Sequence, residues 1–196
     1  MQAARGTSLE PDDSTDPVDP PSVPRARTWW VFAAVAATLY AVDVTTKIVA
    51  IDRLSGREDV RVVGDVLQLH LTRNPGAAFS TGTQYTVVLT CIAMVAVLVV
   101  LWLSRRLGNV VWAVALGFLL AGVAGNLTDR MLRDPGPFRG HVIDFLMLPN
   151  WPVFNVADIC INVAAGLILV QAFRGIRMDG TRGDGRPDEA AGESGG

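Results

Sequence analysis

The sequence contains a run of 19 residues without a charged side chain, YTVVLTCIAMVAVLVVLWL at positions 85–103. A helix needs about 20 apolar residues to cross the roughly 30 Å hydrocarbon core of a bilayer, so this run predicts a transmembrane helix. Three further apolar runs of similar length lie at residues 29–51, 110–127 and 153–173. The chain of 196 residues is therefore predicted to be an α-helical integral membrane protein with four transmembrane helices.

The composition argues against two other classes of protein. Half of the residues are hydrophobic, 18% are charged, and the formal net charge is −2. Residues 1–24 and 178–196 contain little to bury, so the middle of the chain is too apolar for a water-soluble enzyme. A nucleic-acid binder would need a basic surface. We expect both ends to be disordered tails and residues 25–177 to form one membrane domain.

Positive charges near the helix ends predict the orientation in the membrane. Arginine pairs precede the first apolar run, occupy the short loop between the second and third, and follow the fourth: Arg25, Arg27, Arg105, Arg106, Arg174 and Arg177. With four spans these three places lie on one side, which the positive-inside rule assigns to the cytoplasm. Both termini are then cytoplasmic, and residues 52–84 and 128–152 lie on the outer side.

The two outer segments contain strand-like stretches. Leu67, Leu69 and Leu71 alternate with polar residues, which is the period of a half-exposed strand. Residues 141–148 form a second short run of this kind. Two such pieces on one side of a four-helix bundle predict a small β-sheet on the non-cytoplasmic face.

Charged residues inside apolar runs are costly, so each is expected to have a partner or a function. Asp43 and Lys47 are four residues apart and share a helical face, which predicts an ion pair. Asn126, Asp129 and Arg130 also share a face at the end of the third run. Because an adjacent cation stabilises a carboxylate, Arg130 is expected to keep Asp129 ionised as a structural clamp.

Asp144 and Asp158 have no basic neighbour in the sequence. Two carboxylates that meet in a medium of low dielectric share a proton, and such a pair can activate a water while it polarises a carbonyl. This is the chemistry of an aspartic protease. A proton relay in a membrane transporter would use the same acids equally well. For Asp158, capping of a helix start is the simpler alternative.

The sequence predicts no metal site, disulfide or cofactor. Cys91 and Cys160 fall within apolar runs, and there is no C-x-x-C pair or histidine cluster. His70 and His141 are expected to be interfacial or strand residues, because a pair of acids already supplies both an acid and a base.

Five short motifs occur in order along the chain: DVTTK at 43–47, NPGAAFS at 74–80, GNLTDR at 125–130, HVIDF at 141–145 and FNVAD at 154–158. Together they closely resemble the lipoprotein signal peptidase family (signal peptidase II), and the resemblance covers residues 29–174. It implies an intramembrane aspartic endopeptidase of the bacterial inner (plasma) membrane. Such enzymes remove the signal peptide from diacylglyceryl-modified prolipoproteins by cutting just before the lipidated cysteine.

The resemblance also implies roles for individual residues and partners. Asp144 and Asp158 match the catalytic pair, which would lie near the outer leaflet. The residues expected to bind substrate or support the site are Asp43, Lys47, Asn74, Asn126, Asp129, Arg130 and Asn155. Expected partners are lipidated prolipoproteins, membrane lipids and globomycin-type inhibitors, with no nucleic acid, and the protein is expected to be a monomer. A small proton-coupled transporter and a non-catalytic membrane scaffold are the alternatives.

Overall fold

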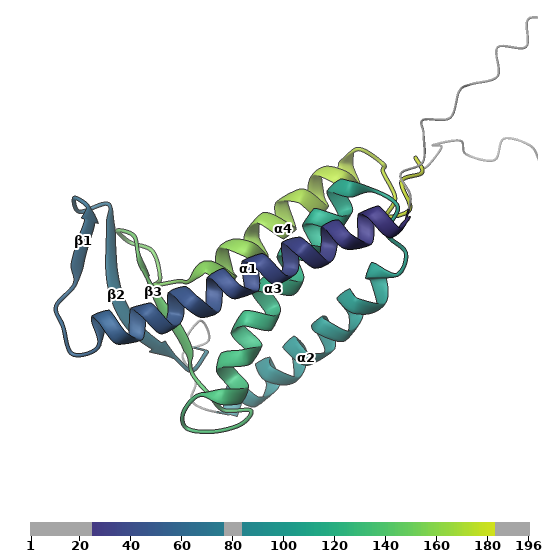
Figure 1. The fold of residues 1–196 in the computed structure, drawn as a ribbon. Helices are drawn as coiled ribbons and strands as arrows, with labels where there is room; N and C mark the ends of the chain where they lie inside the picture. Colours follow the sequence, from purple (N-terminus) through teal and green to yellow (C-terminus); the bar gives the residue numbers. More distant parts are fainter. Residues whose placement is uncertain (1–24, 77–83, 183–196) are drawn as a thin grey trace, which may run out of the picture.

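The computed structural model describes residues 25–76 and 84–182, which form four long helices and a three-stranded sheet (Figure 1). The elements in chain order are α1 (Arg25–Leu54), β1 (Val60–Val63), β2 (Leu67–Asn74), α2 (Gln84–Ser104), α3 (Val110–Leu132), β3 (Val142–Met147) and α4 (Val156–Phe173). All four helices are long and apolar enough to cross a membrane. The predicted fold class, four transmembrane helices with a small sheet, is confirmed.

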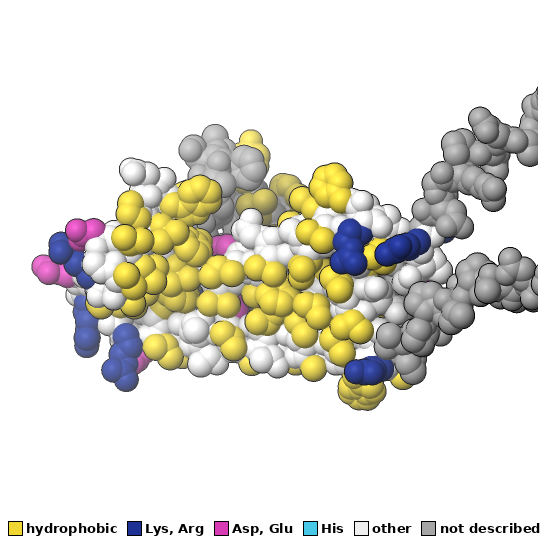
Figure 2. Space-filling view, turned by 90° about the horizontal axis from the view of Figure 1, so that it is seen from above, with side chains coloured by type: hydrophobic (Ala, Val, Ile, Leu, Met, Phe, Trp, Pro, Cys, Tyr) yellow, Lys and Arg dark blue, Asp and Glu magenta, His cyan; other side chains and the backbone are white. Residues whose placement is uncertain are grey.

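Apolar side chains on the outside of the bundle mark it as a membrane protein. Leu98 is 65% exposed and Ile92 is 59% exposed, although both lie within α2, the most apolar helix. Figure 2 shows such side chains along the length of the helices, with Lys and Arg side chains gathered toward the two ends. Helices satisfy their backbone polar groups internally, so this apolar surface is suited to lipid contact.

Small residues allow the helices to approach closely around α3, which packs against each of the other three. A Cβ atom at Gly122 would lie 2.8 Å from the Ile161 side chain and would crowd the Ala157 carbonyl. At Gly125 a Cβ atom would overlap the carboxylate of Asp43. Small residues at such crossings are typical of membrane helices. The position of α3 places its polar end beside both α1 and α4.

The sheet lies at one end of the bundle, in the order β1-β2-β3, with antiparallel pairing throughout (Figure 1). Its strands β2 and β3 are the two that the sequence predicts. Thr72 pairs with Asp144, and Asn74 pairs with Val142. This register places Asn74 and Asp144 near each other where the sheet meets the helices.

The ends of α3 and α4 differ from the predicted boundaries. α3 continues to Leu132, five residues beyond the predicted limit, so the polar residues of its last turns belong to a helix and not to the outer segment 128–152. α4 begins at Val156, three residues later than predicted, because Phe154 forms a β-bridge with Leu146 and Asn155 caps the helix.

The folded chain also continues past the predicted boundary at residue 177. Met178 packs against an apolar cluster that contains Phe32 and Leu107, and Ile176 forms a bridge with Arg182. The remainder of both predicted tails, 1–24 and 183–196, lies outside the described residues.

Candidate functional site

A buried lysine connects α1 to α3. The Lys47 ammonium lies 2.9 Å from Asp43 Oδ2, 2.8 Å from Asp129 Oδ2 and 3.0 Å from Asn126 Oδ1, and its side chain is fully buried. The contact to Asn126 is a hydrogen bond, and the two carboxylates balance the charge of the ammonium group as ion pairs. The predicted ion pair between Asp43 and Lys47 is present.

The two carboxylates that surround Lys47 also bind backbone N–H groups. Asp43 Oδ1 accepts a hydrogen bond of 2.8 Å from the N–H of Ala157, at the start of α4. Asp129 Oδ2 accepts one of 3.3 Å from the N–H of Ile143, on β3. Ala157 directly precedes Asp158, and Ile143 directly precedes Asp144. Lys47, Asp43, Asp129 and Asn126 are called the lysine cluster below. This cluster fixes the backbone beside both of the predicted catalytic acids.

Arg130, the partner predicted for Asp129, forms no direct ion pair with it among the described residues. Its carboxylate contacts Lys47 and Arg133, while the Arg130 guanidinium donates a hydrogen bond of 3.4 Å to the Asn126 carbonyl. Neighbours in a helical sequence point about 100° apart, whereas residues four apart share a face. Arg133 was not among the predicted site residues, although its i+4 spacing from Asp129 indicates a shared helical face.

Asp144 lies on β3 with only 2% of its surface exposed. Its Oδ2 accepts a hydrogen bond of 2.9 Å from Asn74 Nδ2, and its Oδ1 accepts one of 2.6 Å from Asn155 Nδ2. Burial raises the pKa of Asp144 to about 6, and the charge of Asp158 acts in the same direction, while the two amide hydrogen bonds oppose the rise. Asp144 can therefore exchange a proton near neutral pH.

Asp158 lies in the first turn of α4 and is half-buried. Its Oδ1 accepts a hydrogen bond of 2.9 Å from Asn126 Nδ2, and its Oδ2 accepts one of 3.2 Å from the Asn155 N–H. The Asn155 side chain accepts a bond from the Asp158 N–H in return, which completes a capping box. The alternative role for Asp158, capping of a helix start, is thus present. Asp158 Oδ1 does not take part in the cap and faces the polar residues of α3.

Asn155 joins the two acids. Its Nδ2 donates to Asp144 and, at 3.2 Å, to Asn126 Oδ1, while its backbone N–H binds Asp158. A continuous network of hydrogen bonds and ion pairs therefore contains Asp43, Lys47, Asn74, Asn126, Asp129, Asp144, Asn155 and Asp158. Arg130 reaches it through the Asn126 backbone.

The histidines take no part in this network. His70 lies on β2, as expected, and its Nδ1 lies 2.6 Å from Asp59 on the exposed part of the sheet. His141 has a buried Nε2 without a hydrogen-bond partner among the described residues. Within residues 25–76 and 84–182, no group of three His, Cys, Asp or Glu side chains is placed to hold a metal ion.

A largely apolar cavity of about 420 Å³ opens beside Asp158. Its wall is formed by the chain that enters α4 and by the first two turns of that helix. The lining residues are Trp151, Pro152, Val153, Phe154, Asp158, Ile159, Asn162 and Val163. Asp158 is the only charged group among them, so the cavity could hold an apolar segment against a single carboxylate.

A family model described as signal peptidase (SPase) II matches residues 35–174 of this chain. The chain belongs to the signal peptidase II family. The lipoprotein signal peptidase of Mycobacterium avium (strain 104) is 46% identical over 170 residues, which cover 87% of this chain and 91% of that protein. The lipoprotein signal peptidase of Mycolicibacterium smegmatis is 42% identical over 186 residues, which cover 95% and 77% of the two chains.

A solved structure has the same fold. A bacterial membrane enzyme determined by the in meso method at 1.9 Å resolution matches with a TM-score of 0.66 and 23% identity, over 73% of this chain and 92% of that one. Membership in the signal peptidase II family makes the protein a peptidase and thus a hydrolase. The family therefore favours the enzyme over the transporter and scaffold alternatives.

Proposed function

We propose that this protein removes the signal peptide from diacylglyceryl-modified prolipoproteins by cutting just before the lipidated cysteine, with Asp144 and Asp158 as an aspartic catalytic pair. One observation carries the proposal: Asn155 joins both carboxylates in a buried network, and one of them opens on an apolar cavity. The family supports the class of substrate.

The reaction needs only the two acids and a water. The ionised carboxylate takes a proton from the water, and the water oxygen attacks the scissile carbonyl carbon. The protonated carboxyl group donates its proton to the carbonyl oxygen. The tetrahedral intermediate then collapses: the C–N bond breaks and the amine of the lipidated cysteine leaves with a proton from one carboxyl group. The other carboxylate takes a hydroxyl proton of the intermediate as the C=O bond of the product forms, which restores the pair. A carboxyl group with a pKa of about 6, such as Asp144, suits this exchange.

Three asparagines support the pair. Asn74 and Asn155 donate to Asp144, and Asn126 donates to Asp158. Each amide fixes the direction of one carboxylate oxygen, and the lysine cluster holds the backbone beneath. Active-site groups that are themselves held by neighbours lose little freedom when the substrate arrives.

The substrate would reach the site from the bilayer. Trp151 and Ile159 line the cavity beside Asp158 and are 65% and 42% exposed, so an apolar signal peptide can enter laterally. The sheet would hold the lipidated cysteine at the membrane surface. We place this end of the bundle at the outer leaflet of the bacterial plasma membrane and both termini in the cytoplasm, with the protein acting as a monomer and sensitive to globomycin-type inhibitors.

Cleavage of a purified lipidated prolipoprotein tests the proposal. Asp144→Asn and Asp158→Asn are each expected to abolish cleavage while the protein stays folded, because an amide keeps the shape but cannot exchange the shared proton. Asp65→Asn is the matched control, since Asp65 is exposed in the turn between β1 and β2. Substantial processing by either Asn variant would contradict the proposed pair. Equal cleavage of the unlipidated precursor would contradict the proposed substrate.

A further inference from the structure

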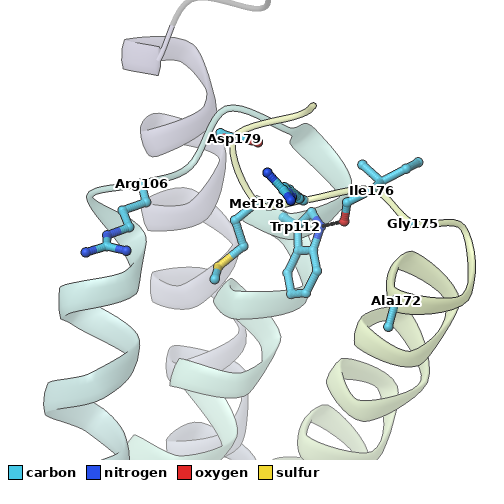
Figure 3. Close-up of a pocket in the computed structure, with 8 residues that line it drawn as sticks. Arg106, Trp112, Ala172, Gly175, Ile176, Met178 and Asp179 are labelled. Carbon is cyan, nitrogen blue, oxygen red and sulfur yellow. Dashed lines mark hydrogen bonds between the residues drawn. The ribbon is translucent and has the colours of Figure 1, made fainter. Parts of the chain in front are cut away.

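A second cavity lies at the end of the bundle opposite to the sheet (Figures 1 and 3). Its volume is about 580 Å³, and it is bounded by the end of α2, the start of α3 and the turn that follows α4. Trp112, Ala172 and Met178 provide apolar surface, and Arg177 provides positive charge. Arg106 lies at the rim, and Figure 3 shows its guanidinium turned away from Trp112 and Met178. None of these residues belongs to the network around Asp144.

The wall of this cavity is held by backbone contacts. The indole N–H of Trp112 donates a hydrogen bond of 2.9 Å to the Ile176 carbonyl, as Figure 3 shows. The N–H of Gly108 donates one of 2.9 Å to the Met178 carbonyl. A side chain at position 108 would overlap the Asp179 backbone, so glycine permits this contact. The turn after α4 is therefore docked on the loop between α2 and α3.

The surroundings of the cavity are strongly positive. Six exposed arginines lie at this end of the described chain: Arg27, Arg105, Arg106, Arg174, Arg177 and Arg182. Among the described residues at this end the single acid is Asp179, which also lines the cavity. Its Oδ1 accepts hydrogen bonds of 3.0 and 2.7 Å from the N–H and hydroxyl of Thr181. The net charge around the cavity attracts anions.

Aromatic side chains place the cavity at the level of lipid headgroups. Trp102 is 50% exposed one turn before Arg106, whose guanidinium lies 4.4 Å from the centre of the indole ring. Phe173 is 88% exposed at the end of α4, next to Ala172 in the cavity wall. Tryptophan favours the boundary between hydrocarbon and water, and the exposed Phe173 needs hydrocarbon beside it. A ligand in this cavity therefore meets both an apolar and a charged environment.

We propose that this cavity binds the headgroup of an anionic glycerophospholipid, with Arg177 at its phosphate, with Arg106 adding positive charge from the rim, and with Trp112 and Met178 against its glycerol and first acyl carbons. Basic pockets between transmembrane helices are suited to such headgroups. Free phosphate is also an anion, but it makes no use of the apolar surface.

Native mass spectrometry of the full-length protein, titrated with phosphatidylglycerol, tests the proposal. The wild-type protein is expected to bind phosphatidylglycerol at least about tenfold more tightly than phosphatidylcholine. The double variant Arg106→Gln/Arg177→Gln is expected to bind phosphatidylglycerol about 30-fold more weakly than the wild type. The matched control is Arg105→Gln/Arg174→Gln, which removes the same charge at the same end but outside the cavity lining, and it should stay within about threefold of the wild type.

Several results would overturn the proposal. Equal affinity of the wild type for both lipids, or equal losses in the two double variants, would mean that the cavity is not a specific site. Inorganic phosphate or glycerol phosphate that competes at the same concentration as the lipid would identify a site for soluble phosphate.

The acidic end of the chain is another possible occupant, because residues 183–196 include Asp184, Asp188 and Glu189. Lipid binding that appears only after these three acids are changed to amides would assign the cavity to the chain's own acidic end. The readout is lipid binding, so it is independent of peptide cleavage.

Discussion

The Asn155 side chain makes three hydrogen bonds in a fully buried position. Its Nδ2 donates to Asp144 and to Asn126, and its Oδ1 accepts from the Asp158 N–H. A buried polar group is costly when it lacks a partner, so this geometry strongly favours an amide, which has donors and an acceptor on one short side chain. A single residue thus combines the cap of α4 with the orientation of Asp144.

Asn155→Asp separates these two roles. Aspartate caps a helix as well as asparagine does, but it cannot donate to Asp144 and adds a third negative charge beside the pair. Cleavage is expected to fall at least about 100-fold, while circular dichroism shows the helical content of the wild type. Asn109→Asp serves as the control, because Asn109 caps α3 far from the proposed catalytic pair, and its Oδ1 accepts hydrogen bonds from the N–H groups of Val111 and Trp112, as an aspartate would. Full activity of Asn155→Asp would show that the donated hydrogen bond is dispensable.

The raised pKa of Asp144 predicts how stability depends on pH. The folded value of about 6 lies above the ordinary 3.8, so the ionised form costs stability, and this cost falls as the pH falls through 6. Between pH 7.5 and pH 5 the wild type should gain about 1.4 kcal/mol from this group. Asp144→Asn lacks this titration, so the difference in thermal midpoint between the variant and the wild type should shift in favour of the wild type when the pH falls from 7.5 to 5. Parallel midpoints across this range would contradict the assignment.

At the scale of elements, α3 organises the bundle through its small residues. It passes close to α1 at Gly125 and close to α4 at Gly122. These contacts bring Asn126, one residue after Gly125, within hydrogen-bonding distance of Lys47 on α1 and of Asp158 on α4. The distance between helix axes therefore decides whether the polar residues meet.

Gly125→Ala is expected to destabilise the protein by about 1–3 kcal/mol, because the new methyl group would overlap the Asp43 carboxylate. Gly166→Ala is the matched control: it lies on α4, where a Cβ atom would meet nothing within 4 Å. Alanine has the higher helix propensity, so this control should be neutral or slightly stabilising. The measurement is the thermal midpoint of each purified variant in the same detergent. Equal midpoints for the two variants would argue against close packing at Gly125.

At the scale of the whole molecule, the lysine cluster joins three helices and the sheet. Lys47 lies on α1, its partner Asp129 lies on α3, and the two carboxylates hold backbone N–H groups of α4 and β3. The elements that carry the proposed catalytic pair are thus connected to each other through one buried ammonium group. Such a cluster is stable only when all its charges are matched.

Lys47→Met should cost about 3–5 kcal/mol, because Asp43 would then be buried without its cation. The double variant Asp43→Asn/Lys47→Met removes both charges and leaves Asp129 paired with Arg133, so it should recover much of the loss. Arg53→Met, at the exposed end of α1, should change nothing. Folded yield after size-exclusion chromatography and the thermal midpoint are the readouts. If the double variant is no more stable than Lys47→Met, an unbalanced buried charge does not explain the destabilisation by Lys47→Met.

The sequence by itself determined the four helices, the strands β2 and β3 and the set of polar residues. Long apolar runs, strand alternation and the i, i+4 spacing of Asp43 and Lys47 are local patterns, and local patterns constrain helices and strands directly. The tertiary structure alone decided which polar groups meet. Asp129 pairs with Arg133 and Lys47 instead of Arg130, and Asn155 stands between two acids that lie 14 residues apart. These contacts depend on how closely helices cross and on the register between β2 and β3, which no single stretch of sequence specifies.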